Sequence, residues 1–144
     1  MSMKLSMIVS LLLALCLAAP AVARNPNPHE AEFQAFRKEL LAATAANDKA
    51  RLADLISFPV EYWSIEKDHN VEEGAIATRE DFLKRYDTLF TEWMRRHLIK
   101  AKSESLDNGR YLMSWTDGGS EFTFVMEFVE PVGWRVRAYG IGAE

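Results

Sequence analysis

The sequence predicts an α+β domain in which helices come first and an antiparallel sheet follows. In residues 29–56 and 78–99, apolar side chains recur every three or four positions, which is the spacing of one helix face. From Tyr111 onward they alternate with polar residues, as in a strand with one buried face. Helices followed by strands are typical of an α+β fold.

Residues 1–23 have the composition of a secretory signal peptide. Lys4 supplies a basic start, residues 5–17 are almost wholly apolar, and Ala21-Val22-Ala23 is a small-residue cleavage site. We expect cleavage near Ala23 and a protein that works in the periplasm or outside the cell, without a membrane anchor. The surroundings of Cys16 resemble a lipidation box, but Leu15 stands where a small residue is needed, so lipid anchoring is not expected.

The chain after the predicted signal peptide is acidic and has no cysteine. The whole sequence carries a net charge of −4, and the one charged residue among the first 23 is Lys4. An acidic chain argues against nucleic acid or an anionic membrane as partner. We expect residues 24–29 to form a flexible tether and residues 30–144 to fold as one domain without a cofactor.

Two helices are predicted at the start of the domain. The first covers residues 29–46, where an apolar stripe repeats at helical spacing. Asp48 is the predicted N-cap of a short second helix, because its carboxylate can accept a hydrogen bond from a free backbone N–H. Pro59 disfavours helix at Phe58, so a strand is predicted over residues 60–65.

The middle of the chain predicts a loop, a brief strand and a helix in two parts. Residues 68–74 are polar and predict a loop, and residues 75–77 predict the strand. Thr78 is the predicted cap of a third helix, and Thr91 is the predicted cap of its continuation. His97 then belongs to a basic patch with Arg95, Arg96, Lys100 and Lys102, which we interpret as a solvated helix face.

The last third predicts a meander of three strands. Asp117-Gly118-Gly119 is a hairpin turn, because glycine tolerates the positive φ that such turns need. A two-residue loop there places the side chain of Trp115 on one apolar face with those of Tyr111, Met113, Phe122, Phe124, Met126 and Phe128. A three-residue turn at residues 131–133 would pair Phe128 with Val136 and Val125 with Tyr139, which puts Tyr139 on the outer face.

Two segments resemble small exported proteins of the nuclear-transport-factor-2-like (SnoaL/ketosteroid-isomerase-like) superfamily. Residues 45–60, AANDKARLADLISFPV, are similar to the second-helix region, and residues 79–91, REDFLKRYDTLFT, are similar to the third helix. The terminal meander is also similar. The resemblance implies a cone-shaped, cystatin-like fold in which N-terminal helices pack on a curved antiparallel sheet. It implies either isomerase or dehydratase activity or non-catalytic binding, because the superfamily includes both.

An isomerase or dehydratase of this fold would need a pocket carboxylate and a tyrosine as oxyanion donor. The candidates are Tyr86, Asp87 and Glu61, with Tyr62 and Tyr111 as further tyrosines. None lies in a catalytic motif, so we favour a non-catalytic protein and interpret Tyr86 as a core tyrosine. His69 lies among acidic residues, Asp68, Glu72 and Glu73, but their spacing is not that of a metal site, and none is expected.

The predicted function is that of an exported binding protein whose aromatic cone holds a small apolar ligand. The lining predicted for that pocket is Tyr62, Trp63, Tyr86, Trp93, Trp115, Phe122 and Phe124. The same side chains are equally suited to a filled core. An isomerase-type or dehydratase-type enzyme and an immunity or inhibitor protein for a periplasmic partner are the alternatives. The outer sheet face is a candidate homodimer interface, through Val125, Val129, Tyr139 and Ile141.

Overall fold

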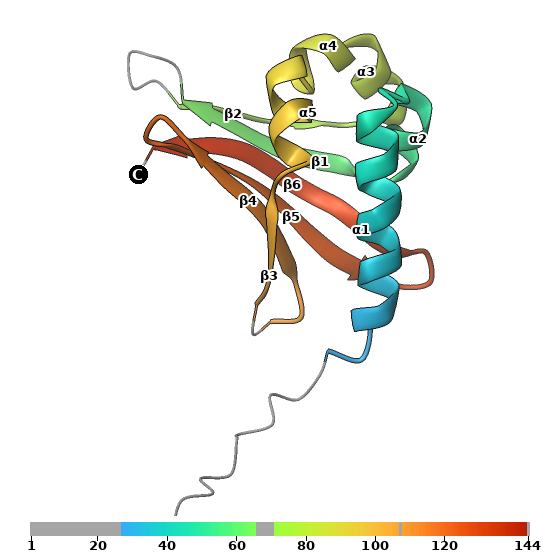
Figure 1. Ribbon diagram of the computed structural model, residues 1–144. Coiled ribbons are helices and arrows are strands. Elements are labelled where there is room, and N and C mark those ends of the chain that lie inside the picture. The colour runs from blue at the N-terminus through green and yellow to red at the C-terminus, as the bar shows by residue number, and fades with distance from the viewer. Residues whose placement is uncertain (1–26, 66–70, 107, 144) are drawn as a thin grey trace, which may run out of the picture.

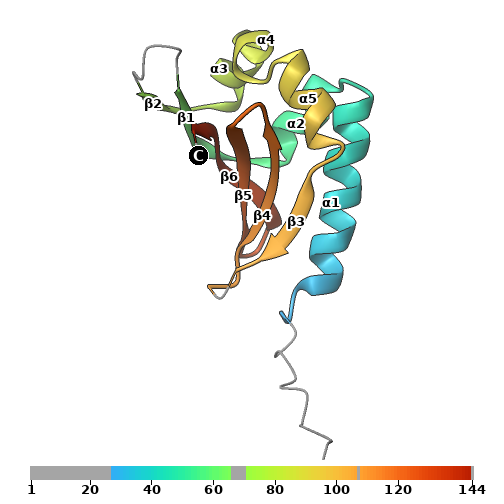
Figure 2. The ribbon, with the colours of Figure 1, turned by 60° about the vertical axis from the view of Figure 1, so that its left-hand side comes forward.

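The computed structural model describes residues 27–65, 71–106 and 108–143, and the predicted signal peptide, Asp68 and His69 lie outside these ranges. In the described residues one six-stranded sheet curves around five helices, which gather on its concave face (Figures 1 and 2). This arrangement confirms the predicted α+β fold. The elements are α1 Glu30–Ala45, α2 Lys49–Asp54, β1 Ile56–Ile65, β2 Val71–Ile76, α3 Arg79–Lys84, α4 Tyr86–Leu89, α5 Glu92–Leu98, β3 Lys102–Ser105, β4 Tyr111–Asp117, β5 Ser120–Val129 and β6 Gly133–Ala143.

The strands lie in the order β2-β1-β6-β5-β4-β3. β1 and β6 are parallel and the other neighbouring pairs are antiparallel. The long helix α1 runs along the sheet, while α3, α4 and α5 cover one end of it (Figure 1). Within the described part of the chain, no helix has both the length and the apolar character needed to cross a membrane.

The three predicted helix caps are confirmed. The side chains of Asp48, Thr78 and Thr91 accept hydrogen bonds from backbone N–H groups three residues later, at 3.1, 3.1 and 3.3 Å. Each cap satisfies a donor that the first turn of a helix leaves free. The predicted third helix is divided at Arg85, where the backbone leaves helical geometry, so that α3 and α4 are separate short helices.

Both edge strands depart from the prediction. β2 begins at Val71, inside the segment that we expected to be a polar loop, and β3 over Lys102–Ser105 was not expected at all. An edge strand has one unpaired side and is usually polar and short, so it lacks the apolar alternation that identifies inner strands. β1 also starts earlier than predicted, at Ile56, and a register irregularity between Ile56 and Glu61 accommodates the intervening proline.

The hairpin of β4 and β5 has the predicted register. Asp117 faces Ser120, so Gly118 and Gly119 form the two-residue loop, and Trp115 faces Phe122. Gly118 and Gly119 have φ values of 60° and 83°, which explains the two consecutive glycines. The predicted apolar face is therefore formed as expected.

The register predicted for β5 and β6 is wrong. Phe128 faces Trp134 and not Val136, because the three-residue turn is at residues 130–132, one position earlier than predicted, which moves the pairing by two residues. The register then shifts between Met126 and Val125, which leaves Arg137 as an extra residue on β6. Such a β-bulge exchanges the faces of all residues beyond it. Tyr139 consequently lies on the concave face, opposite Phe124.

The bulge changes the composition of the outer face. Tyr139 is 3% exposed, so its predicted place in an outer-face interface is wrong. Val125 and Val129 are half-buried on that face, and the side chain of Ile141 lies outside the described residues. Arg137 and Arg110 lie 3.7 and 3.5 Å from the Glu127 carboxylate. Pairing of two copies through this face stays a prediction.

Candidate functional site

Among the described residues, the cavity at the centre of the cone is small. The cavity between the helices and the sheet measures about 10 Å³, which is the space of a single water molecule. Its walls are apolar and come from three helices, three strands and the end of α4: Leu40, Leu52, Ile56, Phe82, Phe90, Phe124, Val136 and Tyr139. The sequence left open whether the aromatic residues line a pocket or fill a core. At this position the structure has a packed core.

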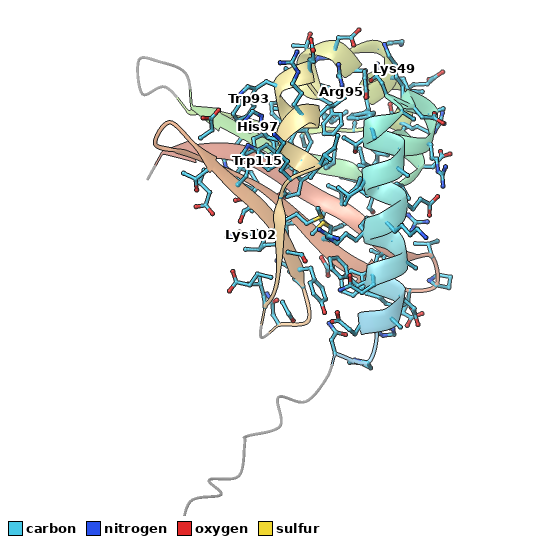
Figure 3. All side chains as sticks on the ribbon, viewed as in Figure 1. Lys49, Trp93, Arg95, His97, Lys102 and Trp115 are labelled. Atoms are coloured by element: carbon cyan, nitrogen blue, oxygen red, sulfur yellow. The ribbon has the colours of Figure 1, made fainter. Side chains whose placement is uncertain are left out.

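Four ring-bearing side chains, three of them half-buried, gather where α5 meets the β4–β5 hairpin. We call this group the aromatic rim and define it as Trp93, His97, Trp115 and Phe122. The Trp115 ring stacks on Phe122 at 4.4 Å between centroids and lies 5.9 Å from the Trp93 ring. Phe122 is buried, whereas Trp93, His97 and Trp115 are half-buried. Figure 3 shows these three side chains together beside α5.

Local sequence explains how the aromatic rim assembles. Trp93 and His97 are four residues apart on α5, so they share one face of the helix. Trp115 points to the concave face of β4, and the hairpin register sets it opposite Phe122. The structure thus brings together four of the residues predicted to line the pocket: Trp93, Trp115, Phe122 and Phe124. The ring centroids of Phe122 and Phe124 are 5.0 Å apart.

One carboxylate joins the two elements of the aromatic rim. Asp117 accepts a hydrogen bond from the Trp93 indole N–H at 3.3 Å. The same carboxylate oxygen lies 3.3 Å from the Nε2 atom of His97. The sequence assigned His97 to a basic patch and Asp117 to a turn. No local pattern in the sequence links them, because they belong to different elements.

Tyr86, a candidate catalytic residue that we interpreted as a core tyrosine, does not open into the cone. Tyr86 is 1% exposed, and its hydroxyl donates a hydrogen bond to the Asn47 side-chain oxygen at 2.9 Å. Lys49 Nζ and the Arg95 guanidinium lie 4.9 and 5.4 Å from the centre of its ring. Burial raises the pKa of Tyr86, and the nearby Arg95 charge partly opposes this increase. Figure 3 shows Lys49 and Arg95 at the helical end of the molecule.

The predicted carboxylates also lie elsewhere. The Asp87 side chain is 76% exposed and pairs with Lys49 at 3.3 Å. Glu61 is exposed on β1, on the outer face of the sheet. Neither carboxylate contacts the hydroxyl of Tyr86, which donates its hydrogen bond to the Asn47 side-chain amide. A carboxylate–tyrosine pair inside the cone is therefore not formed by Tyr86, Asp87 and Glu61.

Tyr62 and Trp63 point to opposite faces of the sheet. Tyr62 pairs with Tyr139, packs against the core and lies over Gly74, where a Cβ atom would be 2.7 Å from its hydroxyl. Trp63 pairs with Gly140 and covers it on the outer face. Trp63 consequently cannot line a pocket on the concave side together with the other predicted aromatics.

Tyr139 is a concave-face residue that the sequence did not identify. Its ring stacks on Phe124 at 5.3 Å, and its hydroxyl donates a hydrogen bond to the Leu89 carbonyl at 2.9 Å. Burial, with a smaller contribution from Tyr62, raises the pKa of Tyr139 above its ordinary value. The hydroxyl is thus held neutral and acts as a structural donor between β6 and α4.

The raised pKa values of Tyr86 and Tyr139 predict a loss of stability in alkali. Both groups are neutral in either state below the ordinary tyrosine value of 10.0. Above it the unfolded chain releases the protons first, so the free energy of unfolding falls by up to about 1.4 kcal/mol per pH unit for each group. Urea unfolding measured across this range should show a shallower fall for Tyr139→Phe. An equal fall in variant and wild type would contradict the prediction.

No family model and no curated protein matches this chain. Solved structures are similar in fold: a domain with a cystatin-like fold from Nostoc punctiforme is 13% identical, over 80% of this chain and 76% of that chain, with a TM-score of 0.46. NTF2-like proteins from Shewanella baltica and Cytophaga hutchinsonii are 15% and 13% identical, over 79% of this chain and 94% and 97% of theirs, with TM-scores of 0.47 and 0.45.

Proposed function

We propose that this chain is an exported, non-catalytic binding protein that takes a small apolar ligand at the aromatic rim. The observation that carries the proposal is the pair of half-buried indole rings, Trp93 and Trp115, 5.9 Å apart beside a filled core. Tryptophan offers a large apolar surface together with a polar N–H, which suits a binding surface. Because the centre of the cone is packed, the ligand lies at the rim and not in the middle.

The location outside the cytoplasm rests on the predicted signal peptide, residues 1–23. Its basic start, apolar stretch and small-residue exit are the features that export requires. An exported binding protein could carry apolar molecules through an aqueous compartment, in which they are poorly soluble. The acidic net charge of the chain is consistent with an uncharged ligand and not with a polyanion.

The non-catalytic character is supported by the positions of the candidate acid–base residues. An isomerase or dehydratase acting through Tyr86 would need a carboxylate beside its hydroxyl in a cavity. The hydroxyl instead contacts the Asn47 amide, and Asp87 faces solvent. An immunity or inhibitor protein would work through a surface such as the outer sheet face, and the experiment below separates that function from ligand binding.

The proposal is tested by titrating the folded protein with a neutral apolar fluorescent probe, N-phenylnaphthylamine, and following probe emission. Trp115→Ala should weaken probe binding by about tenfold or more, because it removes one wall of the site. Trp93→Ala tests the same surface from the helix side and should also weaken binding.

The matched control is Trp63→Ala, which removes an indole from the outer face and should leave probe affinity unchanged. Thermal unfolding of each variant establishes that it is folded at the temperature of the titration. Absence of probe binding by the wild type would contradict the proposal. Loss of binding in Trp63→Ala but not in Trp115→Ala would move the working surface to the outer face.

A further inference from the structure

The tip of the β4–β5 hairpin is attached to α5 through Asp117. This residue directly precedes the Gly118-Gly119 turn, and its carboxylate contacts both Trp93 Nε1 and His97 Nε2 at 3.3 Å. An added Cβ atom at either glycine would meet no atom within 4 Å, so the turn is open to solvent. The Asp117 contacts therefore bridge two elements at the edge of the aromatic rim.

Both ring nitrogens of His97 face oxygen atoms. Nδ1 lies 2.8 Å from the carbonyl oxygen of Trp93, and Nε2 faces the Asp117 carboxylate. A neutral imidazole has one N–H group and one lone pair, so either neutral tautomer directs a lone pair at an oxygen. The doubly protonated ring donates to both oxygens, and its hydrogen bond to the carboxylate is charge-assisted.

Two charged neighbours of His97 have partners of their own. On its own helix, Arg96 pairs with Glu92, and Arg95 donates a hydrogen bond to the Phe90 carbonyl. On the sheet side, the ring stacks 5.8 Å from Trp115. Among the described residues, Asp117 is the charged group at ion-pair distance from the ring. The His97 ring also packs against Trp93, at 4.5 Å between ring centroids.

We propose that proton binding at His97 closes a latch between the hairpin tip and α5. Loss of this proton gives a released state, in which the charge-assisted contact is lost and the Trp93–Asp117 hydrogen bond remains. In the closed state Asp117 holds Trp93 and His97 together through its carboxylate. In the released state the β4–β5 turn moves more freely, because the histidine no longer anchors it. The latch would change access to the aromatic rim with pH. That consequence rests on the proposed function, whereas the latch itself does not.

The test is hydrogen–deuterium exchange of the hairpin amides, residues 116–121, in the full protein without ligand. Measurements at about pH 5.5 and about pH 8 span the range in which histidine titrates. After correction for the intrinsic effect of pH on exchange, the wild type should exchange about two- to fivefold faster at the higher pH, as expected for a partly exposed pair.

Two variants remove the titration but keep hydrogen-bonding atoms in place. His97→Gln cannot gain a charge, and Asp117→Asn keeps an acceptor for Trp93 but loses the carboxylate. Both should abolish the difference between the two pH values. The matched control is His29→Gln, at the start of α1. The His29 ring likewise stacks on an aromatic ring, that of Phe128 at 3.7 Å, and lies 3.4 Å from the carboxylate of Glu32.

His29→Gln should keep the pH effect on the hairpin. A wild type without a pH effect, or an effect that survives in His97→Gln, would overturn the latch. Because no ligand is present, that result would leave the proposed ligand site unaffected. Conversely, a wild type that does not bind the fluorescent probe but shows the pH effect on hairpin exchange would contradict the proposed function and leave the latch unaffected.

Discussion

Replacement of Phe33 by alanine is expected to lower the free energy of unfolding by about 3–5 kcal/mol. Phe33 is 0% exposed and joins α1 to two separate strands. Its ring stacks on Tyr111 of β4 at 3.6 Å and meets Trp134 of β6 edge-on at 5.2 Å. Alanine would leave a cavity between three elements, and rings that are fixed on strands cannot close it.

Urea unfolding at constant pH measures this effect. Phe33→Leu should cost less than Phe33→Ala, because leucine fills part of the space. The matched surface control is Val132→Ala in the β5–β6 turn, where the side chain is 54% exposed, and it should change the free energy by less than about 0.5 kcal/mol. A similar loss in Phe33→Ala and Val132→Ala would show that α1 is not held by this ring.

Replacement of Gly140 by alanine is expected to cost about 1–3 kcal/mol through overpacking. A Cβ atom at this position would lie 2.3 Å from Cδ2 and 2.4 Å from Cγ of Trp63. Cγ is the atom that attaches the indole to its chain, so a movement of the far end of the ring cannot relieve the clash. The backbone of β1 or β6 would have to shift instead.

The double variant Gly140→Ala/Trp63→Ala provides the control for this clash. With the indole absent, alanine at position 140 has room, so the two substitutions should be strongly non-additive in the free energy of unfolding. Trp63→Ala alone measures the cost of uncovering Gly140. Additive effects would contradict the close approach of Trp63 to Gly140 and would assign the loss to backbone conformation.

The helix caps and one hairpin could be predicted from the sequence because they depend on neighbours in the chain. Asp48, Thr78 and Thr91 each bond a backbone group three residues away. The β4–β5 register follows from one turn and from the parity of two apolar strands, so a slip would expose every large side chain. Such features are decided locally, and the structure agrees with them.

The bulge on β6 could not be predicted in this way. An extra residue in a strand leaves no mark in the residue types around Arg137, and the alternation that places Tyr139 outside is interrupted only by pairing with β5. The strand β3 escaped prediction for a related reason. Its residues are mostly exposed, and only the partner strand β4 gives them extended structure.

The candidate site shows the same limit. Trp93, Trp115 and Phe122 could be proposed as aromatic neighbours from their residue type and their expected faces. The contact between His97 and Asp117 joins residues from different elements and depends on how α5 is seated on the sheet. The partner of Tyr86 is Asn47, at the end of α1, so a catalytic interpretation of Tyr86 could be tested only with the helices in place.

The filled centre of the cone has a consequence for the response of the protein to hydrostatic pressure. Pressure favours the unfolded state to the extent that unfolding eliminates internal voids, which water then occupies. A cone that encloses a ligand-sized void loses that volume when it opens. Here the space at the centre is about 10 Å³, so compression of the native protein has little empty volume to remove. At this position we therefore expect the release of void volume to contribute little to unfolding under pressure.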